Sequence, residues 1–248
     1  YQMLYSLFDE PSVFSDPGQD VTGEGLVGWT SKITSSMLLD AYTHAVFPWP
    51  MEEKRVLWFS PFERGVLDFS DLHIPSRLKR FFKSHKFTFR IDLDFKGVIQ
   101  ACASARRPDG GTWITSKIIN AYNRFHLLGF AHSFEAYNAD DLLVGGLYGI
   151  AIDQLFCGES MFFRESGASK FAFLCMIDTL KNLGISWIDT QMVTPLTGSF
   201  GAKEISRDEY IKRLRPRVRM IAPITTDKLR ANAGSLDHLF ETSFPKQP

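Results

Sequence analysis

The sequence predicts an α+β protein in which a small N-terminal domain, residues 1–64, precedes a larger domain, residues 65–248, with one mixed sheet and flanking helices. Strand patterns and helix patterns alternate along the chain after residue 65. Three adjacent strand patterns, over 131–137, 142–151 and 154–162, are followed by a helix and a further strand, an order typical of a sheet covered by helices. The first third of the chain holds only short elements.

The N-terminal elements are bounded by turn-forming residues. Residues 9–25 are rich in Asp, Glu, Gly, Ser and Pro, which favours irregular surface chain. A helix begins near Thr34, whose hydroxyl can cap it, and Phe47-Pro48 ends it because proline disfavours helix in the residue before it. Short strands over 56–59 and 66–69 flank a turn at 60–64.

Most elements of the larger domain have recognisable ends. Proline opens a helix over 75–84, and alternate apolar residues over 86–91 indicate a half-buried strand. Asp94 caps a helix that runs to about 105, and Thr115 caps another that Gly129 ends. A helix over 168–183 and a strand over 187–192 follow, and a capping box at 206–209 begins a short helix.

Charge, cysteine content and absent motifs limit the possible functions. Basic and acidic residues number 28 each, so a nucleic-acid site must be a local basic patch. Cys102, Cys157 and Cys175 lack CxxC spacing, and we interpret them as reduced thiols of a cytosolic protein. We see no signal peptide and no apolar run that could span a bilayer. Motifs of metallohydrolases, serine hydrolases and P-loop enzymes do not occur, so we expect neither a metal nor a cofactor.

The most unusual segment is 156–162, which reads Phe-Cys-Gly-Glu-Ser-Met-Phe. In a strand Cys157, Glu159 and Met161 share one side, so a carboxylate lies between two sulfur side chains. Such a carboxylate is costly to bury unless it binds a cation, for example the ammonium or guanidinium of a substrate. Alternatively, Glu159 pairs with an internal arginine or caps a backbone group.

Trp187, Asp189 and Gln191 alternate in the same way on the strand over 187–192. Asp189 could act as a general base or orient an attacking amine, with Gln191 as a hydrogen-bonding neighbour. If this strand lies at the edge of a sheet, its polar face is simply solvated.

Two loops hold further candidates. The segment Arg164–Ser169 comes close to the loop by which acetyltransferases of the GNAT superfamily hold the pyrophosphate of coenzyme A, although Ser169 replaces the final small residue. Alternatively, this segment is an ordinary connecting loop that binds no pyrophosphate. Trp49 and Trp113 each lie beside a turn, where an indole can stack on a nucleobase or pack between domains.

Two segments are basic and contain no acid. Residues 72–91 hold six Lys and Arg, among them Arg77, Lys79, Arg80 and Lys83, and residues 212–219 hold five. A phosphate backbone would need such local patches, unless they are solvated helix faces.

An ordered set of motifs between about residues 25 and 215 resembles the bacterial leucyl/phenylalanyl-tRNA–protein transferase family. The set includes Phe47-Pro48-Trp49, Trp58-Phe59-Ser60-Pro61, Gly111-Thr112-Trp113-Ile114, Ala131-His132-Ser133-Phe134-Glu135, Leu143–Gly149, Phe156–Phe162 and Ile188-Asp189-Thr190-Gln191. Each motif is modest alone, and their common order makes the resemblance specific.

The resemblance implies a GNAT-like larger domain and an aminoacyltransferase. Its substrates would be Leu-, Phe- or Met-charged tRNA and proteins with N-terminal Arg or Lys, which it would mark for N-end-rule degradation. It implies catalytic or polar site residues at Glu159, Asp189 and Gln191. It implies substrate-binding residues at Trp49, Trp113, Leu147, Gly158, Met161, Ile188 and Ser169, and tRNA-binding residues at Arg77, Lys79, Arg80 and Lys83.

The sequence departs from the family pattern at Phe62-Glu63, at Gly167 and over 195–200, which leaves the preference among Leu, Phe and Met open. Two other functions stay open. A coenzyme A-dependent N-acetyltransferase would suit the loop 164–169, and a non-catalytic tRNA-binding module would suit the basic segments.

Overall fold

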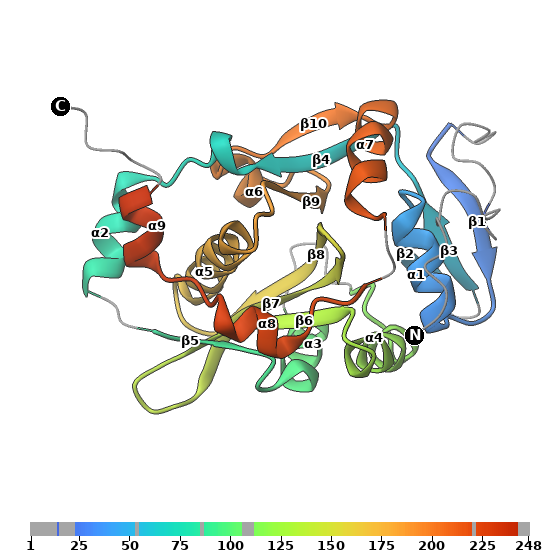
Figure 1. The fold of residues 1–248 in the computed structure, drawn as a ribbon. Coiled ribbons are helices and arrows are strands. Elements are labelled where there is room, and N and C mark those ends of the chain that lie inside the picture. Colours follow the sequence, from blue (N-terminus) through green and yellow to red (C-terminus); the bar gives the residue numbers. More distant parts are fainter. Residues whose placement is uncertain are drawn as a thin grey trace.

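The computed structural model describes residue 14 and residues 23–52, 55–84, 87–105, 112–219 and 222–242. Within them the strands form a three-stranded sheet of order β1-β3-β2 and a seven-stranded sheet of order β10-β4-β9-β8-β7-β6-β5 (Figure 1). This confirms the α+β class, with a small N-terminal sheet and a larger mixed sheet covered by helices.

The small sheet is built around one short helix. Its elements are β1 (Leu26–Thr30), α1 (Ser35–Thr43), β2 (Phe47–Glu52) and β3 (Arg55–Phe59). Thr34 caps α1 as predicted, because its hydroxyl accepts the Met37 N–H at 3.2 Å. After α1 the chain turns at Ala45, whose φ is 64°, and then continues as β2. The proline segment that we predicted to end the helix is therefore itself a strand.

The larger sheet is antiparallel except at one junction. Its strands are β4 (Glu63–Asp68), β5 (Thr88–Ile91), β6 (Ala131–Tyr137), β7 (Leu143–Ile152), β8 (Leu155–Phe163), β9 (Trp187–Gln191) and β10 (Lys203–Ser206). β8 and β9 run parallel and are in register only at Cys157 and Asp189. The ladder between these strands is limited to that pair, and residues that follow it on both strands line a cavity.

Helices cover both faces of this sheet (Figure 1). They are α2 (Ser76–Ser84), α3 (Phe95–Ser104), α4 (Ser116–Leu127), α5 (Ala168–Asn182), α6 (Pro195–Ser199), α7 (Arg207–Leu214), α8 (Thr226–Ala231) and α9 (Leu236–Thr242), with 3-10 turns η2 (Phe69–Asp71) and η3 (Arg215–Arg217). One buried apolar cluster joins α3 and α4 to the small sheet, and a second surrounds α5. No helix in the described ranges combines the length and apolarity of a membrane span.

The predicted caps agree with the structure. Asp94, Thr115 and Ser206 each accept a backbone N–H from the first turn of their helix. The predicted strands near 56–59 and 66–69 also exist, as β3 and β4, but they belong to different sheets and do not pair with each other. The small sheet lies before residue 60 and the large sheet begins at residue 63; the domain boundary at 64–65 stays a prediction.

Candidate active site

A cavity of about 280 Å³ lies where α5 and α6 meet β7, β8 and β9. Eight of the residues singled out in the sequence line it: Trp49, Trp113, Leu147, Gly158, Glu159, Met161, Ile188 and Gln191. Two others do not. Asp189 is completely buried behind the cavity wall, and Ser169 is buried in the first turn of α5.

Two tryptophans bring the small sheet and the larger domain together at this cavity. Trp49 comes from β2, and Trp113 precedes α4. Their rings stack with centroids 5.8 Å apart and planes 27° apart. Both line the cavity while packing against each other, so the two interpretations of these residues are compatible.

A β-bulge places Glu159. Gly149 pairs with Gly158 and Tyr148 pairs with Ser160, so Glu159 is an extra residue without a partner on β7. We predicted that the side chains of Cys157, Glu159 and Met161 lie on one face of the strand, and this is wrong. The extra residue moves the side chains that follow it in β8 to the opposite face of the sheet. Cys157 belongs to the apolar cluster of α3 and α4, whereas Met161 packs against the cluster of α5.

Three neutral donors hold the Glu159 carboxylate. Tyr42 Oη donates to its Oε1 at 2.6 Å, Gln191 Nε2 donates to the same oxygen at 2.9 Å, and Tyr122 Oη donates to Oε2 at 3.3 Å. Burial raises the pKa of Glu159 to about 7, although these hydrogen bonds act in the opposite direction. Among the described residues no cation pairs with Glu159, so the alternative of an internal arginine partner is wrong for this part of the chain.

A buried arginine, Arg64, binds Asp189 instead. Its Nε and Nη2 donate to the two carboxylate oxygens at 3.0 and 2.6 Å. Tyr210 Oη donates to Asp189 Oδ2 at 2.7 Å and Cys157 Sγ donates to it at 3.2 Å. β9 lies between β4 and β8, so the alternative of a solvated edge strand is wrong.

Gln191 links the two carboxylates. Its backbone N–H donates to Asp189 Oδ1 at 2.7 Å, and its side-chain Nε2 donates to Glu159. Its backbone is left-handed, with φ of 61°, a conformation that a residue with a side chain keeps only when its surroundings hold it. The amide nitrogen is bound to Glu159, and no described residue donates to the amide oxygen of Gln191, which can therefore act as an acceptor.

The rest of the cavity is mostly apolar. Leu147, Met161 and Ile188 lie with Phe173, Met176 and Leu196, which the sequence analysis did not identify. Phe173 and Met176 are three residues apart on α5, a spacing that places both on one helix face and could have indicated them. A Cβ at Gly158 would meet only the Asp189 carbonyl oxygen, at 3.7 Å, so this glycine leaves space open.

Comparison with known proteins now decides the family. A model of leucyl/phenylalanyl-tRNA protein transferase matches residues 66–215, and a model of the N-terminal domain of that enzyme matches residues 31–61. A leucyl/phenylalanyl-tRNA–protein transferase of Sulfurimonas denitrificans is 39% identical over 86% of this chain and 92% of its own length. One of Pectobacterium carotovorum is 41% identical over 85% of this chain and 89% of its own. The chain belongs to the leucyl/phenylalanyl-tRNA protein transferase family.

Membership in this family makes the chain an aminoacyltransferase. Among solved structures, L-PGS from Bacillus licheniformis aligns with a TM-score of 0.37 and 10% identity over 65% of this chain and 51% of that one.

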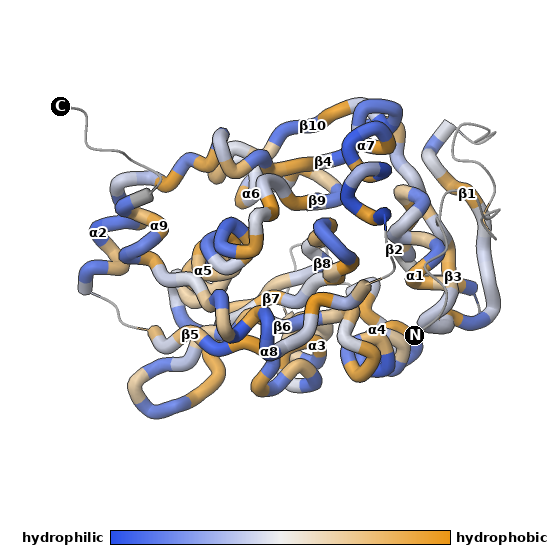
Figure 2. Tube along the Cα trace, in the orientation of Figure 1, coloured by the Kyte–Doolittle hydropathy of each residue, from blue (hydrophilic) through white to orange (hydrophobic). Residues whose placement is uncertain are grey.

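The basic residues predicted to bind tRNA lie on α2, at the end of the molecule opposite the small sheet (Figures 1 and 2). Arg77, Arg80 and Lys83 are exposed. Lys79 lies under the Phe240 ring of α9, with Nζ 5.6 Å from the ring centroid, and burial lowers its pKa. Three of the four predicted residues are therefore open to a phosphate backbone.

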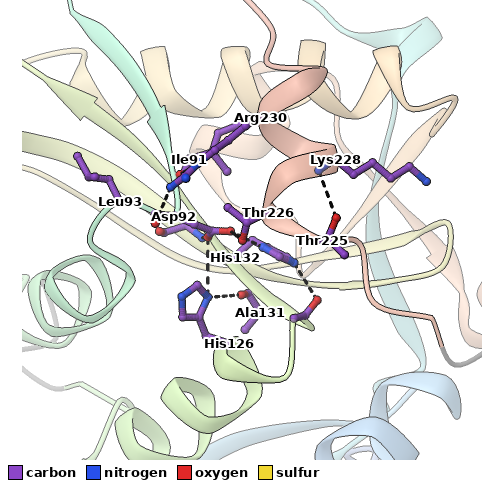
Figure 3. Close-up of polar contacts among 12 residues, drawn as sticks. Ile91, Asp92, Leu93, His126, Ala131, His132, Thr225, Thr226, Lys228 and Arg230 are labelled. Atoms are coloured by element: carbon purple, nitrogen blue, oxygen red, sulfur yellow. Dashed lines mark hydrogen bonds and ion pairs between the residues drawn. The ribbon is translucent and has the colours of Figure 1, made fainter.

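Asp92, His126 and His132 form a cluster (Figure 3), and none of them lines the cavity. His132 Nδ1 contacts Asp92 Oδ2 at 2.6 Å, and its Nε2 contacts the Gly129 carbonyl at 3.0 Å. His126 Nδ1 lies 2.7 Å from the Ala131 carbonyl. The nitrogens that face Asp92 thus already contact acceptor oxygens, and a metal ion would have to displace those contacts.

The same cluster holds the C-terminal segment. Thr226 Oγ1 donates to Asp92 Oδ2 at 2.6 Å, and Arg230 donates to the carbonyls of Ile91 and Asp92 at 2.9 and 3.0 Å (Figure 3). We interpret the cluster as a structural anchor of α8 on the larger sheet.

Proposed function

We propose that the chain transfers Leu or Phe, and also Met, from aminoacyl-tRNA to the N-terminal Arg or Lys of acceptor proteins, which marks them for N-end-rule degradation. The observation that carries this proposal is Glu159, a carboxylate at the wall of a largely apolar cavity, with only neutral donors around it among the described residues. An apolar cavity suits the Leu or Phe side chain, and a partly buried carboxylate favours a cationic acceptor.

The reaction is the aminolysis of an ester. The neutral α-amine of the acceptor attacks the ester carbonyl carbon, a C–N amide bond forms, and the C–O bond to the tRNA 3′-terminal ribose breaks. The proton lost by the amine ends on the ribose oxygen. Because the ester is already activated, holding the two reactants in place supplies much of the acceleration, and no covalent enzyme intermediate is required.

The polar and basic residues have separate roles in this reaction. The Gln191 amide oxygen is the acceptor that can hold an N–H of the attacking amine, because its nitrogen is bound to Glu159. Asp189 has both oxygens occupied and is buried, so we assign it the positioning of Gln191 through that residue's backbone N–H. Arg77, Arg80 and Lys83 provide the basic surface for tRNA phosphates.

A transfer assay tests this function. The purified protein is incubated with Leu-tRNA or Phe-tRNA and a peptide that begins with Arg, beside a matched peptide whose α-amine is acetylated. We expect one added residue on the free peptide and none on the acetylated one. Transfer of an acetyl group from acetyl-CoA instead, with a rise in melting temperature on adding acetyl-CoA, would favour the acetyltransferase alternative.

A further inference from the structure

A second cavity, of about 370 Å³, lies between α2, the start of α5 and the end of α6. Arg77 and Lys170 line it together with the hydroxyl-bearing Ser166 and Ser199, and none of its lining residues is acidic. Neither Arg77 nor Lys170 has an ion-pair partner within the described residues. We call this space the cationic cavity.

The packing of α2 on α5 brings the two cations together. At Gly167 the backbone is left-handed, with φ of 84°, and a Cβ there would lie 2.4 Å from Cε1 of Phe81. The Phe81 ring therefore packs directly on Gly167. Arg77 is one turn before Phe81 on the same face of α2, and Lys170 lies in the first turns of α5. Two like charges held in one recess repel each other, and a bound anion would relieve that repulsion.

The cationic cavity shares a wall with the candidate active site. Phe173 lines the active-site cavity, Phe200 lines the cationic cavity, and their ring centroids are 5.1 Å apart. On α5, Lys170 and Phe173 are separated by about one helical turn, a rise of about 5 Å. On α6, Thr197 faces the first cavity and Ser199 the second. The two cavities are therefore neighbours, separated by the Phe173 and Phe200 rings.

We propose that the cationic cavity binds a phosphodiester of the single-stranded 3′ end of the donor tRNA while the aminoacyl group occupies the active-site cavity. This proposal rests on the proposed function. The terminal ribose carries the ester, and its 5′ phosphate is the next charged group along the strand. This phosphate must therefore lie close to the active-site cavity. The Arg77 guanidinium and the Lys170 ammonium can donate charge-assisted hydrogen bonds to phosphate oxygens, and the Ser166 hydroxyl can add a neutral one.

Three donors with different numbers of phosphates test the proposal: aminoacyl-adenosine, which has none, aminoacyl-CpCpA, which has two phosphodiesters, and the charged tRNA. Transfer to one Arg-initiated peptide is measured with the wild type, Arg77→Gln, Lys170→Gln and the double variant. Lys96→Gln removes an exposed lysine on α3, on the other face of the sheet, and serves as the matched control.

We expect each of the two substitutions to lower kcat/KM for aminoacyl-CpCpA and for tRNA by about tenfold. Transfer from aminoacyl-adenosine should stay within about twofold of wild type. Equal losses with aminoacyl-adenosine would overturn the proposal, because they indicate damage to the neighbouring active site. Losses confined to the full tRNA would also overturn it, because the contact would then lie on the acceptor stem. Failure of the wild type with all three donors would instead count against the proposed function.

Discussion

Arg64 holds Asp189 through two hydrogen bonds, from Nε to Oδ1 at 3.0 Å and from Nη2 to Oδ2 at 2.6 Å. The side chains are 2% and 0% exposed, so this is a buried ion pair. The same guanidinium donates from Nη1 to the Ala45 carbonyl at 3.1 Å, in the turn that leads to β2. The pair thus connects the strand that carries Gln191 with the segment that carries Trp49.

Breaking this pair should cost both stability and rate. We expect Asp189→Asn and Arg64→Gln each to lower the free energy of unfolding by about 3–5 kcal/mol, because each leaves an unpaired buried polar partner. We also expect a lower kcat, because Gln191 loses its support. Urea unfolding and steady-state transfer measure the two effects. The double variant should lose much less than the sum of the single losses; strict additivity with an unchanged kcat would contradict this assignment.

Gly158 should set the depth of the active-site cavity. A side chain there meets open space, so Gly158→Val is expected to fold and to fill part of the cavity. It should exclude Phe before Leu, because the ring needs more depth. Discrimination should be graded, since one methylene in an apolar pocket contributes about 1–3 kcal/mol. Competition between Phe-, Leu- and Met-charged tRNA measures it, and an unchanged Phe-to-Leu ratio would show that the cavity binds something else.

The exposed cations of α2 should carry part of the tRNA affinity. Replacing Arg80 and Lys83 by Gln should weaken tRNA binding and lower the slope of log K against log salt by about one unit per lost phosphate contact. Transfer from aminoacyl-adenosine should be unaffected. The control replaces Lys96 on α3. An unchanged salt slope would assign tRNA binding to another surface, with the basic segment 212–219 the next to test.

The Asp92 anchor should make stability depend on pH in the acid range. Burial opposes ionisation of Asp92, but hydrogen bonds from His132, Thr226 and the Ser133 N–H outweigh it and lower its pKa. A carboxyl with a lowered folded pKa contributes stability that is present above its unfolded pKa of about 3.9 and is lost as the pH falls below it. Asp92→Asn should therefore lower the melting temperature at pH 7 and flatten its acid dependence. Wild-type stability in the variant at pH 7 would refute the anchor.

The sequence predicted the local structure better than the long-range contacts. Caps at Thr34, Asp94 and Thr115 depend on neighbouring residues, so their helices could be located. The bulge at Glu159 depends on how β8 pairs with β7, which the chemical pattern of one strand does not reveal. Arg64 and Asp189 are 125 residues apart, and the Tyr42 and Tyr122 hydroxyls converge on Glu159 only after folding.

The short C-terminal elements were also missed for a physical reason. β10, α8 and α9 span only four to seven residues each, which is too short for a periodic pattern of apolar residues to be recognised. They are held by contacts to distant segments, as Thr226 is by Asp92.

Glu159 also leads to a pH prediction. With its pKa raised to about 7, the carboxylate becomes ionised as the pH rises through 7, and only then does it attract a cationic acceptor. The KM for an Arg-initiated peptide should therefore fall as the pH rises through this range. Glu159→Gln keeps the shape of the side chain but cannot ionise, so its KM should not show this step. A step that persists in the variant would belong to another group, such as the α-amine of the peptide.

The most direct test of the account is the ratio of kcat/KM for an Arg-initiated peptide to that for an otherwise identical Ala-initiated peptide, with Phe-tRNA as donor. We expect a strong preference for Arg in the wild type. In Glu159→Gln that preference should largely disappear, while the KM for Phe-tRNA stays the same. A Glu159→Gln enzyme that retained the wild-type ratio would show that this carboxylate does not select the acceptor.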